Sequence, residues 1–239
     1  YRGHKKKLGL FLSMIRFHMI GLHRTLFADR VLAEMMAPIT PEGDSLLWDY
    51  LGRRFVPLSY DEADRFCQYS REFITSLLPK DPIYLSLLPP NARAAVAQVH
   101  NETKSARKML ERLGFEHRNF VDPFDGGPHL DAKTDEILPV AHTNTRTVGN
   151  AVAASKCTEM CIVSKLDTDG EFRAIHEKVS LVNGNAISLT KECMDALEVE
   201  KGDEVGVTPM DFFGKSAGKD AKSTKKSAKK KTSKAGSKR

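Results

Sequence analysis

Apolar residues recur every three or four positions across residues 8–27, which read LGLFLSMIRFHMIGLHRTLF. This spacing predicts a helix. We expect its buried face to carry Leu8, Phe11, Leu12, Ile15, Met19 and Leu22. The following DRVLAEMM, residues 29–36, predicts a short strand.

Further helix-period segments cover residues 43–55, 59–78, 91–99 and 103–113. Ser59 and Glu62 have the spacing of a capping box, which predicts that a helix begins there. The last of these segments stops at Gly114, and residues 115–124 then read as extended chain. Because glycine adopts backbone angles that other residues avoid, it lets a helix turn sharply into a strand.

The pattern changes near Val148. Short apolar runs such as MCIVSKL, AISLT and DEVGVTPM alternate with turn residues, which predicts a small β-rich domain over 148–211. Residues 212–239 are mostly Lys, Ser, Ala, Thr and Gly, a composition too polar to bury a core, so we expect a disordered tail. Together with residues 1–147, this predicts an α/β (α+β) protein in three parts.

Charge is divided unevenly along the chain. The whole sequence carries +6, but residues 215–239 hold ten lysines and one arginine against one aspartate, which is +10. Residues 1–214 therefore carry 6 − 10 = −4. A mildly acidic body favours a small cationic substrate, and weak nucleic-acid contact through the Lys-rich tail remains an alternative. The tail has no aromatic residue on which bases could stack.

The four cysteines, at 67, 157, 161 and 193, lack the spacing of a paired framework. Cys157 and Cys161 are four apart, but no further ligands follow at zinc-site spacing, so we predict structural thiols and no metal. No run of 18 apolar residues is present, which predicts a cytoplasmic protein that does not cross a membrane. The chain begins at Tyr1, which favours a part of a longer protein.

The segment ARKMLERLGF, residues 106–115, resembles the last helix and strand of the GNAT acyltransferase fold, with Ala106, Leu113, Gly114 and Phe115 at matching positions. In that fold this helix lines the acyl-CoA arm, although any helix that ends at Gly-Phe looks similar. Many such enzymes carry a tyrosine that protonates the leaving thiolate. Here Leu110 stands at that position, so another group must supply the proton.

The same fold holds the pyrophosphate of acyl-CoA on a glycine-rich loop before a long helix, whose free N–H groups and positive dipole end face the phosphates. The basic stretch YRGHKKKLG precedes the first predicted helix. Arg2, Gly3, Lys7 and Gly9 are therefore our candidates for binding the donor. Lysines replace the usual glycines, and a solvated basic loop is the alternative reading.

His100 lies in AQVHNET, between two predicted helices. A histidine at such a junction can transfer a proton near neutral pH. It can equally cap the following helix. The residues alone leave both roles open.

Longer segments are similar to the arginine N-succinyltransferase family, notably RFHMIGLHRTLFADRVLAEMM, PKDPIYLSLLP and AQVHNETKSARKMLERLGFEHRNFVDPFDGGP. The similarity covers residues 1 to about 210, with Ala97 in place of a family glycine, and implies that an N-terminal part is missing. It implies that His100 donates a proton while succinyl passes from succinyl-CoA, a co-substrate and not a resident cofactor, to the α-amine of L-arginine. A non-catalytic fragment acting as an interaction module is the alternative, and homo- or hetero-oligomeric assembly is left open.

Two carboxylates are candidates for the substrate side. Glu34 lies in an apolar strand, where burial would require an ion pair or a cationic substrate. Asp125 in FDGGP either caps the Gly126–Gly127 turn or reaches the substrate. We expect His129, shortly after it, to be a surface residue.

Overall fold

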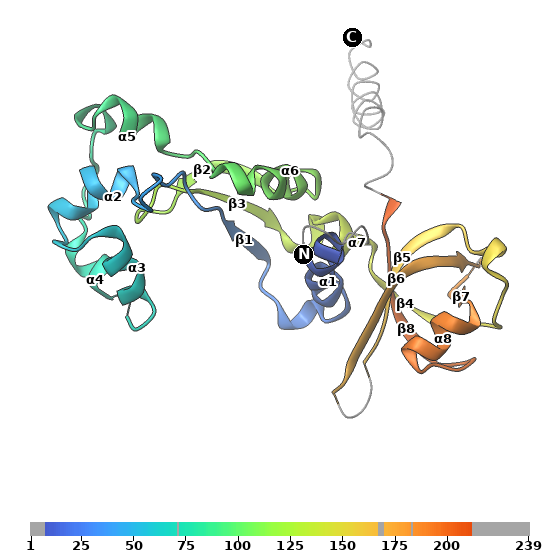
Figure 1. The fold of residues 1–239 in the computed structure, drawn as a ribbon. Coiled ribbons are helices and arrows are strands. Elements are labelled where there is room, and N and C mark those ends of the chain that lie inside the picture. Colours follow the sequence, from blue (N-terminus) through green and yellow to red (C-terminus); the bar gives the residue numbers. More distant parts are fainter. Residues whose placement is uncertain (1–7, 71, 167–169, 183, 212–239) are drawn as a thin grey trace, which may run out of the picture. The chain divides into compact units, whose positions relative to one another are not determined.

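A computed structural model describes residues 8–70, 72–166, 170–182 and 184–211, and shows a mixed α+β protein (Figure 1). The chain divides into two compact units. One, the sheet–helix unit, comprises residues 25–138, and the other, the barrel unit, combines residues 1–24 with 139–239. These units differ from the predicted division at residues 147 and 148, because the first helix and the strand before Val148 belong with the later β structure. The predicted tail, residues 212–239, lies outside the described residues.

The sheet–helix unit contains a three-stranded antiparallel sheet in the order β1-β3-β2. Its strands are β1 (Arg30–Glu34), β2 (Glu116–Val121) and β3 (Pro128–Lys133). Glu34 pairs with His129 across β1 and β3. The β2–β3 register is irregular between His117 and Val121, where Asn119 has a φ of 64°. The predicted strand over 29–36 is confirmed, and β3 was not predicted.

Helices in this unit are shorter than the pattern predicted. They are α2 (Leu46–Tyr50), α3 (Tyr60–Cys67), α4 (Glu72–Leu77), α5 (Pro90–Ala95) and α6 (Lys104–Arg112), with 3₁₀ turns at Arg24–Leu26, Gly52–Arg54, Leu85–Leu87, Asn101–Thr103 and Thr134–Glu136. The predicted helix over 59–78 is broken into α3 and α4. The capping box of Ser59 and Glu62 is present, and the chain leaves α6 through Gly114 at a φ of 106°, as the sequence predicted.

An aromatic cluster supports the turn between β2 and β3. The Phe124 ring lies 4.5 Å from that of Trp48 and 5.0 Å from that of Tyr60. The Trp48 indole N–H donates to the Leu58 carbonyl at 3.0 Å, so the buried ring has its polar atom satisfied. This packing fixes the residues just before Asp125.

The barrel unit is built on a closed five-stranded barrel in the order β4-β7-β6-β5-β8. Its elements are β4 (Asn144–Val148), β5 (Glu159–Leu166), β6 (Phe172–Leu181), β7 (Ala186–Ser188) and β8 (Glu204–Pro209), with α7 (Leu138–His142), a 3₁₀ turn at Ala154–Lys156, and α8 (Lys191–Leu197). Val148, Val163, Ile187 and Leu197 are among its core residues. Closure leaves no free sheet edge. The short apolar runs after residue 148 thus correspond to strands, but the first strand begins before the predicted boundary.

The first helix, α1 (Leu8–Leu22), packs in the barrel unit through a face that only partly coincides with the predicted one. Its buried residues are Met14, Phe17, His18 and Ile20. Leu12, expected in the core, is 64% exposed. Because α1 is apolar on most sides, its periodicity did not identify the face that packs.

Three of the four cysteines are buried and none of the four forms a disulfide, in agreement with structural thiols. Within the described ranges, no group of three or more metal-ligating side chains is placed to hold a metal ion. Among the helices that the structure describes, none combines the length and apolar character needed to span a bilayer.

Candidate active site

Asp125 organises the turn between β2 and β3. Its Oδ1 accepts a hydrogen bond from the Gly127 N–H at 2.7 Å, and its Oδ2 accepts one from the Ala37 N–H at 3.1 Å. The capping role considered for Asp125 is therefore observed. The second bond ties the turn to the segment after β1, a contact that the sequence did not predict.

Glycine is required where these segments meet. A Cβ at Gly127 would overlap the carbonyl oxygen of Met35, and Gly126 adopts a φ of 82°. The Met35 N–H donates to the Pro128 carbonyl at 3.2 Å. The turn and the residues after β1 are consequently in direct backbone contact.

The segment containing His100 joins the same place. The Ala97 N–H donates to the Gly126 carbonyl at 2.9 Å, and the His100 N–H donates to the Met36 carbonyl at 2.9 Å. Three stretches far apart in sequence, at residues 34–37, 97–100 and 125–128, thus form one site. Hydrogen bonds thus join the segments of His100 and Asp125, two of the residues predicted from sequence, to the segment after β1.

The His100 side chain caps a short helical turn. Its Nδ1 accepts from the Glu102 N–H at 3.3 Å, at the start of the 3₁₀ turn Asn101–Thr103. When Nδ1 accepts, the proton of the neutral imidazole is on Nε2. The ring is half-buried. The capping reading is therefore observed, and it orients the ring so that Nε2–H can donate.

Asp125 has a raised pKa. Burial raises it, and the hydrogen bonds from Gly127 and Ala37 lower it by a smaller amount. The nearby His129 also favours the ionised carboxylate. Each Asp125 oxygen accepts one backbone hydrogen bond and retains a second lone pair.

Glu34 is exposed at the end of β1, so the expectation that it is buried and therefore needs an ion pair is wrong. The strand lies at the sheet edge and one of its faces is open, which the apolar sequence context did not indicate. Opposite it, His129 was expected at the surface. Its Nε2 is instead buried, without a hydrogen-bond partner among the described residues.

Ala97 occupies a position that favours glycine. Its φ is 62°, in the left-handed region, where a Cβ costs roughly 1–2 kcal/mol. A glycine, which the family resemblance places here, would adopt this conformation without that cost. No motif spacing revealed this strain.

The candidates for donor binding are only partly described. Gly9 is the second residue of α1, as predicted, and it is exposed. A Cβ there would meet no atom within 4 Å, so no close contact demands glycine. Arg2, Gly3 and Lys7 lie outside the described residues.

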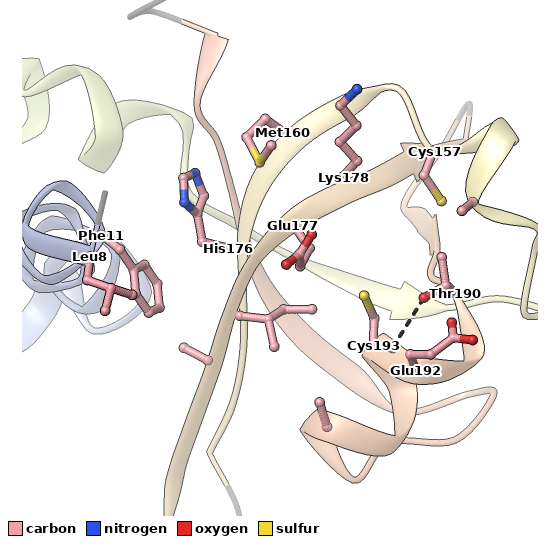
Figure 2. A pocket seen from close by; sticks show the side chains of 14 residues that line it. Leu8, Phe11, Cys157, Met160, His176, Glu177, Lys178, Thr190, Glu192 and Cys193 are labelled. Atoms are coloured by element: carbon pink, nitrogen blue, oxygen red, sulfur yellow. Dashed lines mark hydrogen bonds between the residues drawn. The ribbon is translucent and has the colours of Figure 1, made fainter. Parts of the chain in front are cut away.

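A groove of about 980 Å³ opens in the barrel unit (Figure 2). Leu8 and Phe11 of α1 line it together with His176, Cys157 and Cys193. Of the predicted site residues that the structure describes, Gly9, Glu34, His100 and Asp125, none lines this groove.

Comparison with known proteins gives a consistent result. The family model described as arginine N-succinyltransferase beta subunit matches residues 1–139. The arginine N-succinyltransferase of Enterobacter sp. (strain 638) is 35% identical over 206 residues, covering 84% of this chain and 58% of the relative. That of Escherichia coli (strain 55989 / EAEC) is 35% identical over 202 residues, with the same coverage.

The chain therefore spans 58% of the length of these curated relatives. A solved structure, the arginine/ornithine succinyltransferase subunit AI from Pseudomonas aeruginosa, matches with a TM-score of 0.65 and 31% identity. The match covers 82% of this chain and 56% of the solved chain. The family model matches more than half of the sequence, and the chain belongs to the arginine N-succinyltransferase family.

Proposed function

We propose that this protein transfers a succinyl group from succinyl-CoA to the α-amine of L-arginine, with His100 as the proton donor. The observation that carries the proposal is the orientation of His100. Its Nδ1 accepts a backbone N–H, which fixes the ring and leaves Nε2 outside the cap. Because a neutral imidazole is too weak an acid to protonate a thiolate, the donor is the imidazolium form, which is also protonated at Nδ1 and releases the cap. Family membership supplies the substrates.

The reaction needs few groups. The neutral α-amine attacks the thioester carbonyl, a tetrahedral intermediate forms, the C–S bond breaks, and the thiolate takes the Nε2 proton of the His100 imidazolium, which becomes neutral. Leu110, at the position where a tyrosine would serve this purpose in related folds, is buried and cannot donate. The proton lost by the amine passes to a base that we leave unassigned.

Two carboxylates are candidates for binding L-arginine, which accepts the succinyl group. We propose that the exposed Glu34 pairs with the positive charge of the substrate, since it has no burial cost to offset. Asp125 contributes by holding the turn against the segments of Met36 and His100, and substrate contact by its remaining lone pairs stays a prediction. The site thus supplies negative charge beside a proton donor.

The donor side is proposed on the GNAT-type resemblance. In this arrangement α6 and β2 correspond to the last helix and strand of the acyltransferase sheet, and Arg2, Gly3, Lys7 and Gly9 face the phosphates of succinyl-CoA. The first N–H groups of an α-helix have no partner within the helix, which suits the start of α1 to anions. The family model is described as a beta subunit and the solved structure as subunit AI, so we also propose assembly with further subunits.

The test is a thiol-release assay on the full chain with succinyl-CoA, using L-arginine and L-ornithine as alternative acceptors. We expect thiol release that depends on arginine and a product whose mass equals that of arginine plus one succinyl group. Release that is equal without an acceptor would show hydrolysis and overturn transfer. No release from folded protein would favour the non-catalytic fragment.

A further inference from the structure

His18 is a fully buried polar residue in the middle of α1, with 0% of its surface exposed. Its Nδ1 lies 2.6 Å from the Thr208 hydroxyl on β8, and its Nε2 lies 2.6 Å from the Ser164 hydroxyl on β5. Both ring nitrogens therefore connect the helix to the barrel. A buried imidazole without such partners would be strongly destabilising.

The direction of each hydrogen bond in this network can be assigned. The Thr143 hydroxyl donates to the Pro139 carbonyl at 2.7 Å, so it accepts from the Thr208 hydroxyl, 2.6 Å away. Thr208 must then accept from Nδ1–H of His18. In the neutral ring Nε2 then accepts from the Ser164 hydroxyl. The donor and the acceptor are thereby assigned for each hydrogen bond of the network from Ser164 to Pro139.

The helix lies directly on the barrel around this network. A Cβ at Gly21 would overlap the Thr143 side chain, and one at Gly206 of β8 would overlap Leu22. Nearer the start of α1, the Phe11 ring stacks on His176 of β6, with centroids 5.8 Å apart and planes 8° from parallel (Figure 2). Contacts therefore exist at both ends of the helix.

Apolar contacts alone allow a helix to rotate or slide at small cost, whereas a directed polar network accepts one arrangement. The first turn of α1 lies ten residues before His18, which is roughly 15 Å along the axis. A tilt of roughly 5° at His18 would shift that turn by about 1 Å, enough to disturb a positioned ligand. The network is therefore suited to setting where the helix N-terminus lies.

We propose that the network of His18, Ser164, Thr208 and Thr143 is a positioning device, through which the barrel sets the affinity of α1 for the phosphates of the acyl-CoA donor. The inference rests on the proposed function, in which the start of α1 binds the donor. It gives a role to the barrel, whose strands lie beyond the residues matched by the family model. His18 acts through the helix and does not itself contact the donor.

The test compares two substitutions of one hydroxyl in the full chain. Thr208→Val keeps the shape but leaves Nδ1–H without an acceptor, whereas Thr208→Ser keeps the hydroxyl. Ile187→Val, in the barrel core on β7, is the control for stability loss alone. Coenzyme A is titrated into each protein by calorimetry, and amide hydrogen exchange of residues 17–22 is followed in parallel.

We expect Thr208→Val to weaken coenzyme A binding about tenfold and to speed exchange in α1. Thr208→Ser should stay within about twofold of the wild type, and Ile187→Val should bind as the wild type does. If Thr208→Val does not fold, Ser164→Ala, which removes only the donor to Nε2, takes its place with the same expectation.

Equal affinities in wild type and Thr208→Val would overturn the inference and leave the proposed function intact. Weaker binding by Ile187→Val as well would also overturn it, since stability alone would then explain the effect. Wild-type protein that does not bind coenzyme A would overturn the donor side of the proposed function, and this inference with it.

Discussion

Acidification should destabilise the barrel unit through His18. Burial, assisted by the charge of His23, lowers the pKa of His18 from 6.5 to about 4. The folded state therefore keeps the imidazole neutral at a pH where the unfolded chain is protonated. This agrees with the hydrogen-bond network, in which Nε2 of the neutral ring accepts from the Ser164 hydroxyl.

The size of the effect follows from the pKa difference. A shift from 6.5 to about 4 is about 2.5 units, which corresponds to about 3 kcal/mol at 1.36 kcal/mol per unit. Between these values the unfolded chain binds one more proton than the folded chain, so the free energy of unfolding falls as pH falls. The stability that depends on the neutral His18 imidazole is fully present above pH 6.5 and is lost progressively as the pH falls toward about 4.

The assay must report on the correct unit. Trp48, the single tryptophan, lies in the sheet–helix unit, so its fluorescence does not follow the barrel. Urea titrations monitored through amide resonances of α1 and the barrel strands give the free energy of unfolding at each pH. His18→Gln is the matched control, because glutamine can donate and accept but does not titrate.

The wild type should lose about 3 kcal/mol more than His18→Gln between about pH 7 and pH 4, because all other groups titrate alike in both proteins. A difference between the two that stays constant within about 0.5 kcal/mol across this range would refute the reasoning. The imidazole would then be charged in the folded state, and the assigned bond directions would be wrong.

Three substitutions near the candidate active site, followed by urea unfolding with Trp48 fluorescence, test the local geometry. Ala97→Gly should raise the free energy of unfolding by about 0.5–1 kcal/mol, because it relieves left-handed strain, and a loss would contradict this. Gly127→Ala should lower it by about 2–3 kcal/mol through overlap with Met35, and a neutral effect would contradict the close backbone contact. Asp125→Ala should cost about 2 kcal/mol by leaving two backbone N–H groups without acceptors, and an unchanged midpoint would show that water replaces the carboxylate.

Local signals in the sequence predicted local structure well. The capping box at Ser59 and the end of α6 at Gly114 were found where the sequence placed them, since each depends on residues within one turn. The packed face of α1 was not predictable, because the helix is apolar nearly all round and the barrel determines which side is buried. The available signal for the packed face was His18, a polar residue within that apolar run, and the periodicity did not take it into account.

The candidate site needed tertiary information. The approach of the segments of Met36, His100 and Asp125 depends on hydrogen bonds between residues far apart in sequence, which no spacing encodes. Resemblance to a family identified His100 without showing how its ring is held. The exposure of Glu34 and the buried Nε2 of His129 depend on which sheet face is covered, and period-two patterns do not specify that.

The central claim is that His100 donates the proton to the leaving thiolate, and its most direct test is the turnover of His100→Asn. Asparagine can accept the Glu102 N–H and keep the cap, but it cannot supply a proton near neutral pH. With succinyl-CoA and L-arginine saturating, the account predicts that kcat for thiol release falls by about 10²–10⁴-fold while the unfolding midpoint is unchanged. Wild-type turnover by His100→Asn across neutral pH would contradict it, and would leave His100 as a cap alone.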